Sequence, residues 1–326
     1  MKIIVVDKNE AGQRLDKLLT KHLNKAPKSF IYKMLRKKNI TLNGKKADGS
    51  EKTSVDDEIK FFLSEETIAN FTEEFKAVKV KNNVEVIYED DNIIALNKPA
   101  GLLSQKAEKD DISLVEHIIS YMLDTGKITN EELNTFKPGI CNRLDRNTSG
   151  LVIAGKTLIG LQVMSEMFRD RTLEKYYLTL VKGEITEKKK IDGYLLKDEK
   201  TNKVTIYNEH KVNSDQIKTE YTPLKVTEGY TLLRVKLITG KTHQIRAHLS
   251  SIGYPILGDV KYGSIKENEK FKKKFRLTHQ LLHAYEVKFP KMDNILKNLE
   301  GLSIQAELPK DFKEILDSFK WRSLRE

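Results

Sequence analysis

The octapeptide GLVIAGKT, residues 150–157, limits the possible folds most strongly, because it matches the glycine-rich phosphate loop letter for letter. That loop follows a strand and must keep its backbone amides free to curl around a phosphate. Here the residues before Gly150 are RLDRNTS, which is polar and typical of a turn, and the residues between the glycines are Leu, Val, Ile and Ala. The pattern therefore predicts a buried strand that begins after a turn, and the match to the phosphate loop is accidental.

Further strand-like runs cover residues 176–181, 204–208, 220–226 and 230–239. Before these runs, Ser113 with Glu116 forms a capping box and Thr157 can cap a second helix; after them, residues 243–253 read as a third helix that ends at Gly253. Strands outnumber helices and do not alternate with them. This predicts an α+β fold with a mixed, mostly antiparallel sheet and flanking helices.

The charge of the chain is unevenly distributed. Of a net charge of +11, residues 1–64 carry +7, from 15 Lys and Arg against 8 Asp and Glu. Residues 25–46 hold eight basic residues and no acidic one. Such a cluster favours a nucleic-acid partner, because bound counterions are released, although a solvated face would give the same pattern. An anionic membrane is a weaker alternative, since no strongly amphipathic basic helix accompanies the charge.

The basic segment itself reads as two helices followed by a hairpin. Leucines at 15, 18, 19 and 23 share one helical face, Pro27 ends that helix, and Ser29 can cap the next one. Asn43-Gly44 marks a tight turn between two short strands. The second helix and the hairpin would then present one positive surface, formed by Lys33, Arg36, Lys37, Lys38, Lys45 and Lys46. Residues 64–82 have mixed charge and little periodicity, and we interpret them as a linker.

Thiol and metal chemistry find little support. The single cysteine, Cys141, excludes an internal disulfide framework and lies in an apolar run, which is typical of a small buried residue. His279 and His283 are four residues apart but lack a matching set of Glu or Cys ligands, so we expect hydrogen-bonded core histidines and no metal. The longest apolar runs are too short to span a bilayer, and we expect a cytoplasmic protein.

Asp145 is the remaining candidate in the polar turn before the buried strand, between Arg143 and Arg146. Local context alone also allows a helix cap or a surface ion pair. The segment NRLDRNTSGLVI, however, resembles the signature of pseudouridine synthases that modify large-subunit ribosomal RNA and some transfer RNA. Segments at 97–104, 174–183, 238–263 and 281–290 resemble the other motifs of that family, in the same order. Residues 13–63 resemble the S-four-type RNA-binding domain, whose second helix and following turn contact RNA.

The resemblance implies domains at 1–63 (RNA binding), 64–82 (linker) and 83–326 (a pseudouridine synthase-type catalytic domain). It implies an isomerase that needs no cofactor, with 23S ribosomal RNA as the expected partner, transfer RNA as an alternative, and no obligate protein partner. By resemblance Asp145 is the reacting carboxylate, Arg246 keeps it ionised, and Tyr177 stacks on the uracil. Arg143 would fill the space that a flipped base leaves, and Lys98 and Lys241 are modest candidates for phosphate contacts. Strand alternation makes Tyr176 the more probable core residue of the two tyrosines.

The chain departs from the family pattern at two positions. It has Asn142 where the family usually has His, and Lys241 where the family usually has Arg. Asn142 can still donate hydrogen bonds, whereas Lys241 keeps the charge but loses the bidentate fork. The modified uridine, the chemical route of Asp145 and the role of residues 291–326 are open at this stage.

Overall fold

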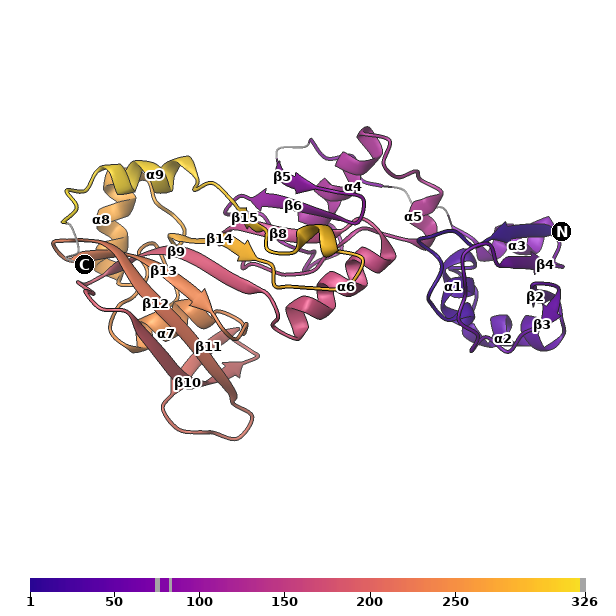
Figure 1. Ribbon diagram of the computed structural model, residues 1–326, viewed down its shortest axis with the longest axis horizontal. Coiled ribbons are helices and arrows are strands. Elements are labelled where there is room, and N and C mark those ends of the chain that lie inside the picture. Colours follow the sequence, from indigo (N-terminus) through magenta and orange to yellow (C-terminus); the bar gives the residue numbers. More distant parts are fainter. Residues whose placement is uncertain (74–76, 82–83, 323–326) are drawn as a thin grey trace.

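A computed structural model describes residues 1–73, 77–81 and 84–322. The molecule is elongated, with a small N-terminal unit at one end and a large twisted sheet that fills the rest (Figure 1). Within the described residues there is a four-stranded sheet of order β1-β4-β2-β3 and an eleven-stranded sheet, each with its own apolar core. The predicted α+β class is therefore confirmed.

The N-terminal unit packs two helices against its sheet, and a third helix follows the last strand. Its elements are β1 (Lys2–Val5), α1 (Leu15–His22), α2 (Lys28–Arg36), β2 (Ile40–Leu42), β3 (Lys45–Lys46), β4 (Glu58–Phe61) and α3 (Glu65–Phe71). The four predicted leucines are buried, three of them in α1 and Leu23 directly after it. Asn43 and Gly44, with φ of 50° and 74°, form the turn between β2 and β3. Ser29 was wrongly predicted as a helix cap, because α2 already begins at Lys28, behind Pro27.

Part of the segment predicted as a linker belongs to the N-terminal unit. Ser64 caps α3, and the ring of Phe71 lies 4.3 Å from that of Phe30 in α2. The domain limits stay a prediction, and the boundary at residues 82 and 83 lies outside the described residues. Asn9 connects the unit to a helix beside the large sheet, because its Oδ1 accepts the amide of Leu158, the first residue of α6 (Leu158–Arg169), at 3.2 Å.

The large sheet runs in the order β11-β10-β12-β13-β9-β14-β8-β6-β5, with β7 beside β8 and β15 beside β14. All of its pairings are antiparallel except the one between β14 and β8, as expected for a mixed, mostly antiparallel sheet. The strands are β5 (Glu85–Glu89), β6 (Ile93–Lys98), β7 (Gly139–Ile140), β8 (Ser149–Gly155), β9 (Glu174–Lys182), β10 (Lys189–Asp198), β11 (Lys203–Tyr207), β12 (Asp215–Thr227), β13 (Tyr230–Leu237), β14 (Leu282–Lys288) and β15 (Ser303–Gln305).

Helices flank this sheet: α4 (Leu114–Asp124), α5 (Glu132–Thr135), α6 (Leu158–Arg169), α7 (Gln244–Ser251), α8 (Ile265–Phe275), the short 3-10 helix η1 (Lys297–Leu299) and α9 (Lys310–Asp317). The predicted capping box at Ser113 and Glu116, the Thr157 cap of α6 and the end of α7 before Gly253 are all present. None of the helices in the described part of the chain is long and apolar enough to cross a membrane.

The C-terminal segment, which carried no recognisable motif, completes the sheet and one apolar cluster. Its strand β15 pairs with β14, and its helix α9 buries Phe312 and Ile315 against residues of β13 and α8. In Figure 1, α8 and α9 lie together at the end of the sheet far from the N-terminal unit.

Candidate active site

A pocket of about 700 Å³ opens over the middle of the large sheet. Its lining includes five segments that are distant in sequence: residues 103–105, residues 141–145 before β8, residues 175–177 of β9, residues 240–246 at the start of α7, and residues 282–287 of β14. These are the segments whose motifs carried the family resemblance. The structure thus brings Asp145, Tyr177 and Arg246 to one pocket.

The turn that carries Asp145 is fixed from two sides. The hydroxyl of Ser104 accepts the amide of Leu144 at 3.0 Å and donates to the carbonyl of the same residue at 2.8 Å. Asn142 donates to the carbonyl of Leu151 and accepts the amide of Ile153, at 3.2 and 2.9 Å. Asn142 therefore anchors the turn to β8, which a side-chain amide can do as well as an imidazole.

Arg246 holds Asp145 from the opposite wall. Its Nη1 donates to Asp145 Oδ2 at 2.7 Å, while its Nε and Nη2 donate to the two oxygens of Asp259 at 2.7 and 3.0 Å. Burial would lower the pKa of Arg246, but the hydrogen bonds and charges of Asp259 and Asp145 raise it above its ordinary value. The predicted pairing of Arg246 with Asp145 is confirmed, and it joins residues 101 positions apart.

The two oxygens of Asp145 are in different situations. Oδ2 is occupied by Arg246, and no hydrogen bond or ion pair to Oδ1 is found among residues 1–73, 77–81 and 84–322. The side chain is 27% exposed, so it can be reached from the pocket. One oxygen is thus held in place, while the other has no partner among the described residues of a side chain that lines the pocket.

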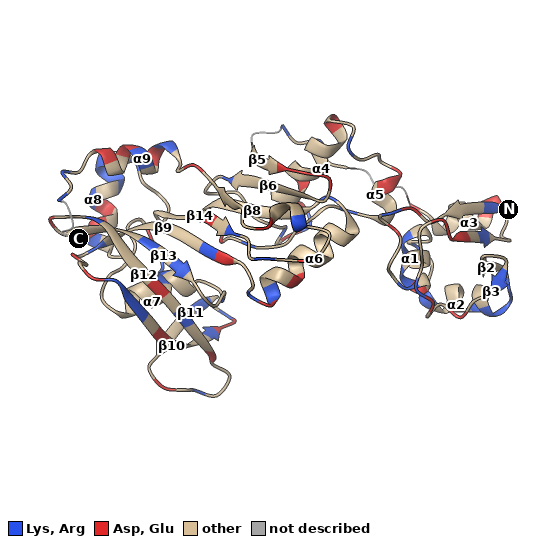
Figure 2. Cartoon of the chain, in the orientation of Figure 1, with Lys and Arg blue, Asp and Glu red and all other residues tan. Residues whose placement is uncertain are grey.

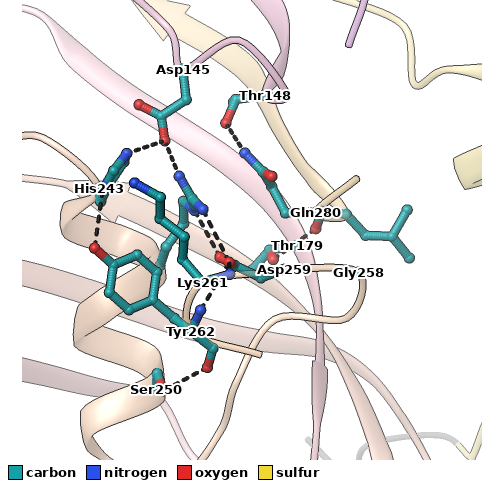
Figure 3. Close-up of polar contacts among 12 residues, drawn as sticks. Asp145, Thr148, Thr179, His243, Ser250, Gly258, Asp259, Lys261, Tyr262 and Gln280 are labelled. Atoms are coloured by element: carbon teal, nitrogen blue, oxygen red, sulfur yellow. Dashed lines mark hydrogen bonds and ion pairs between the residues drawn. The ribbon is translucent and has the colours of Figure 1, made fainter. Parts of the chain in front are cut away.

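Sequence reasoning missed three residues of this network. Asp259 has a fully buried carboxylate and also accepts the amides of Lys261 and Tyr262, at 2.8 and 3.0 Å. His243 lies with its Nε2 3.9 Å from Asp145 Oδ2 and its Nδ1 3.0 Å from the hydroxyl of Tyr262, as Figure 3 shows. The signal was available, because Asp259 and Tyr262 fall in the segment GDVKYG of the longest motif.

Tyr177 and Tyr176 occupy different faces of β9. Tyr177 is 9% exposed and lines the pocket, and burial, with the charge of Asp145, raises its pKa far above the ordinary value. The expectation that Tyr176 is a core residue is wrong. It is half-buried, donates to Glu174 at 2.8 Å, and stacks under the guanidinium of Arg234 at 3.7 Å, because cations of neighbouring strands cover that face.

Of the two lysines predicted to contact phosphate, only Lys241 lines the pocket. Lys98 does not face the pocket: it is fully buried, and its Nζ donates to the carbonyls of Pro99, Leu102 and Arg146 at 2.7–3.0 Å. Burial lowers the pKa of Lys98 to about 7 against the opposing effect of Asp145. Lys241 lines the pocket but is paired with Asp215 at 2.6 Å, and Arg143 is exposed at the pocket wall.

Several other cations line the pocket and were not predicted: Arg169, Arg171, Lys175 and Lys197. Arg169 and Lys197 form ion pairs with neighbouring carboxylates. No ion pair of Arg171 or Lys175 is found in the described part of the chain. The charged residues are spread along the whole molecule in Figure 2, so charge density alone does not mark the pocket.

The rejected alternatives can be checked directly. Residues 150–155 form the buried strand β8, and a Cβ at Gly150 would lie 2.3 Å from the carbonyl oxygen of Ala284 in β14. Lys156 pairs with Glu89 at 2.6 Å and is not free for a phosphate. Cys141 also lines the pocket, but burial raises its pKa to about 11, which disfavours the thiolate.

The two candidate metal-ligating histidines have other partners. His283 is buried between Ser149 and the carbonyl of Ala306, at 2.9 and 3.1 Å, and His279 pairs with Asp311 at 3.3 Å. Outside residues 74–76, 82–83 and 323–326, no cluster of three metal-ligating side chains is found.

On the N-terminal unit, all six predicted RNA-contacting residues are exposed: Lys33, Arg36, Lys37, Lys38, Lys45 and Lys46. They lie on α2, on the residues that follow it and on the hairpin strand β3, which are adjacent in Figure 1. The surface that the sequence predicted is therefore present, and its role stays a prediction.

Residues 92–251 match the model of the family described as "RNA pseudouridylate synthase". An uncharacterized RNA pseudouridine synthase of Mycoplasma genitalium is 30% identical over 96% of this chain and 98% of its own length. The ribosomal large subunit pseudouridine synthase C of Haemophilus influenzae is also 30% identical, over 98% of this chain and 95% of its own length. Among solved structures, human RNA pseudouridylate synthase domain containing 4 has a similar fold, with a TM-score of 0.58, 22% identity, and coverage of 74% of this chain and 94% of its own.

Proposed function

Because this chain belongs to the RNA pseudouridine synthase family, whose members are isomerases, we propose that it converts specific uridines of 23S ribosomal RNA to pseudouridine, with Asp145 as the nucleophile. The relatives named for the large ribosomal subunit support this choice of RNA. The observation that carries the assignment of Asp145 is the Asp145–Arg246 pair, which faces Tyr177 in one pocket.

The reaction needs only groups that this chain supplies. The bond from N1 of uracil to the ribose breaks, C5 takes the place of N1, the proton on C5 leaves and N1 gains one, so atoms and electrons balance. A carboxylate can attack an electron-poor carbon of the ribose or the uracil, or it can stabilise positive charge that develops on the ribose. Arg246 fixes Oδ2 of Asp145 and leaves Oδ1 free for this step.

A paired uridine must leave the helix before it can reach Asp145, at a cost of a few kcal/mol. Tyr177 is positioned to stack on the flipped uracil, and such stacking contributes roughly 1–3 kcal/mol. Arg143, an exposed residue of the pocket lining, would enter the space that the base leaves. The raised pKa of Tyr177 means that its hydroxyl stays protonated near neutral pH and can donate a hydrogen bond to the base.

The N-terminal unit would supply affinity without chemistry. Its six exposed cations on α2 and the hairpin fit a role in backbone binding, as in S-four-type RNA-binding domains. Lys241 would be a weaker phosphate ligand than predicted, since Asp215 already neutralises it. A cytoplasmic location is consistent with this substrate.

The decisive experiment is tritium release from RNA labelled at C5 of uracil. We expect the wild type to release tritium from a 23S ribosomal RNA transcript, and Asp145→Ala to bind this transcript normally but release none. Asp215→Ala is a matched control, because it removes a carboxylate that is paired with a pocket-lining cation, Lys241, without itself lining the pocket. Equal release by wild type and Asp145→Ala would refute the role of Asp145.

The choice of RNA is tested separately. Equal amounts of 23S ribosomal RNA and total transfer RNA, both transcribed without modification, are offered to the wild type, and pseudouridine is mapped in each. We expect modification at discrete positions of the ribosomal RNA. Modification of transfer RNA alone would overturn the proposed substrate and leave the assignment of the active site intact.

A further inference from the structure

The cations of the active-site pocket fall into two groups. Arg169, Lys197, Lys241 and Arg246 each contact a carboxylate within 3.0 Å. Arg143, Arg171 and Lys175 have no such partner in the described residues, and none of the three has a side-chain hydrogen bond there. Arg143 already has a proposed role in base flipping, which leaves Arg171 and Lys175 to be explained.

The ammonium of Lys175 lies where a charge is energetically unfavourable, so packing alone does not explain this residue. It is half-buried on β9, and its pKa is lowered by burial first and by the charge of Arg171 second. A half-buried ammonium whose nearest charged influence is another cation costs free energy unless an anion joins them. Long cations that serve only solubility lie on open surfaces instead.

The position of Lys175 also indicates that an anion bound to it would lie beside whatever occupies the pocket. Residues two apart on a strand point to the same face, so Lys175 and Tyr177 share one face of β9, and both line the pocket. Its Nζ is the nearest atom to the position that a Cβ would take at Gly240, at 3.8 Å, which places the ammonium against the loop before α7. Arg171 enters from the turn between α6 and β9, where its φ is +59°.

We propose that Arg171 and Lys175 form a binding site for a phosphate of the RNA backbone, next to the uridine that enters the Asp145 pocket. This inference rests on the proposed function. The phosphate would be held by two cations on the side of Tyr177, so the nucleotide would be fixed both by stacking and by its backbone. Lys241, whose charge Asp215 neutralises, is replaced in this role by Lys175.

The proposal predicts opposite effects on binding and stability. Lys175→Met keeps the length of the side chain and removes the charge. It should raise KM for the 23S ribosomal RNA transcript on the order of ten-fold, with kcat changed less than about two-fold. It should also flatten the slope of log KM against log salt concentration by about 0.7–0.9, the contribution of one phosphate contact. Without RNA the same variant should melt at a higher temperature, because an unpaired, half-buried charge is gone.

Three variants complete the test. Lys175→Arg should keep KM and the salt slope close to wild type. Arg171→Gln should raise KM, and the double variant with Lys175→Met should lose less than the product of the two effects, since both cations hold one phosphate. Arg169→Gln is the matched control: Arg169 lines the same pocket, but it is paired with Glu166 and Asp170, and its loss should leave KM unchanged within about two-fold.

The inference is overturned if Lys175→Met matches Arg169→Gln in KM and salt slope, or if it lowers the melting temperature. It is also overturned if inorganic phosphate, at matched ionic strength, stabilises the wild type but not Lys175→Met while KM for the RNA is equal, because the site would then serve a free anion. If the wild type released no tritium from any RNA, the proposed function would fail. Binding of the transcript would still compare the same variants.

Discussion

Asp259→Asn is the sharpest test of how the active site is held together. The carboxylate of Asp259 is fully buried and accepts four N–H groups: Nε and Nη2 of Arg246 and the amides of Lys261 and Tyr262. Oδ1 receives three of these bonds, so the substituted amide would keep its oxygen there and turn its NH2 toward Nε of Arg246. Two donors would then face each other, and Arg246 would lose half of its counter-charge.

Removing one partner of a buried ion pair costs about 3–5 kcal/mol. Asp145 still neutralises Arg246 in the variant, so we expect the lower end, about 3 kcal/mol, which corresponds to a fall in melting temperature of roughly 6–12 °C. Asp215→Asn is the comparison. It breaks an ion pair whose side chains are 35% and 52% exposed, and exposed pairs contribute less than about 1 kcal/mol.

Activity should fall as well. Without Asp259 the guanidinium of Arg246 is no longer fixed, so the 2.7 Å contact to Asp145 Oδ2 loses its support. We expect kcat for tritium release to drop more than about ten-fold at 20 °C, where the variant is folded, because a misplaced catalytic group costs this much or more. Equal melting temperatures for Asp259→Asn and Asp215→Asn would refute the reasoning, and so would unchanged kcat in the first variant.

Three further predictions follow from the same structure. Cys141 should resist labelling by iodoacetamide at pH 8 in the folded protein, because a pKa of about 11 leaves the thiol almost fully protonated; rapid labelling would contradict this pKa. Cys141→Ser should retain activity. Gly150→Ala should destabilise the protein by about 1–3 kcal/mol more than Gly229→Ala in thermal unfolding, since both glycines have positive φ but only Gly150 has a carbonyl 2.3 Å from the added Cβ. Finally, burial would raise the pKa of Asp259, but Arg246 and two backbone amides lower it below the ordinary value, so the carboxyl is protonated more readily in the unfolded chain. The free energy of unfolding should therefore fall as pH drops below about 4. This fall should be shallower for Asp259→Asn when unfolding is followed by fluorescence.

Much of the local structure follows from periodicity and caps. The strand at 149–155, the Asn43-Gly44 turn, the Thr157 cap and the apolar face of α1 depend on neighbours in sequence, and the structure contains all of them. Tyr176 shows the limit. Alternation along β9 assigns residues to two faces, but it does not say which face is covered by other apolar side chains. The face of Tyr176 is covered by cations instead, because Arg234 of β13 and Lys288 of β14 lie within 6 Å of its ring.

The site was predictable only through motifs. No local rule places Arg246 against a carboxylate 101 residues away, and the family resemblance supplied that pairing. Lys98 was misjudged for a related reason: its loop is rich in turn residues, which suggests exposure, but the carbonyls of Leu102 and Arg146 fold around its ammonium. Whether a lysine faces solvent or three carbonyls is decided by the packing of two distant loops.

The distribution of carboxylates around the pocket explains how an anionic site can accept a polyanion. Asp145 and Asp259 together carry more charge than Arg246 neutralises, so this network by itself would repel RNA. Arg143, Arg171 and Lys175, which have no carboxylate partner among the described residues, line the same pocket, and in our proposal they reverse that balance where the backbone passes. Because Arg246 is already occupied by the carboxylates of Asp145 and Asp259, it can hold Asp145 without attracting a phosphate to the oxygen that we propose reacts. In the proposed reaction, separating the cations that would bind RNA from the cation that fixes Asp145 keeps the free oxygen available for uridine.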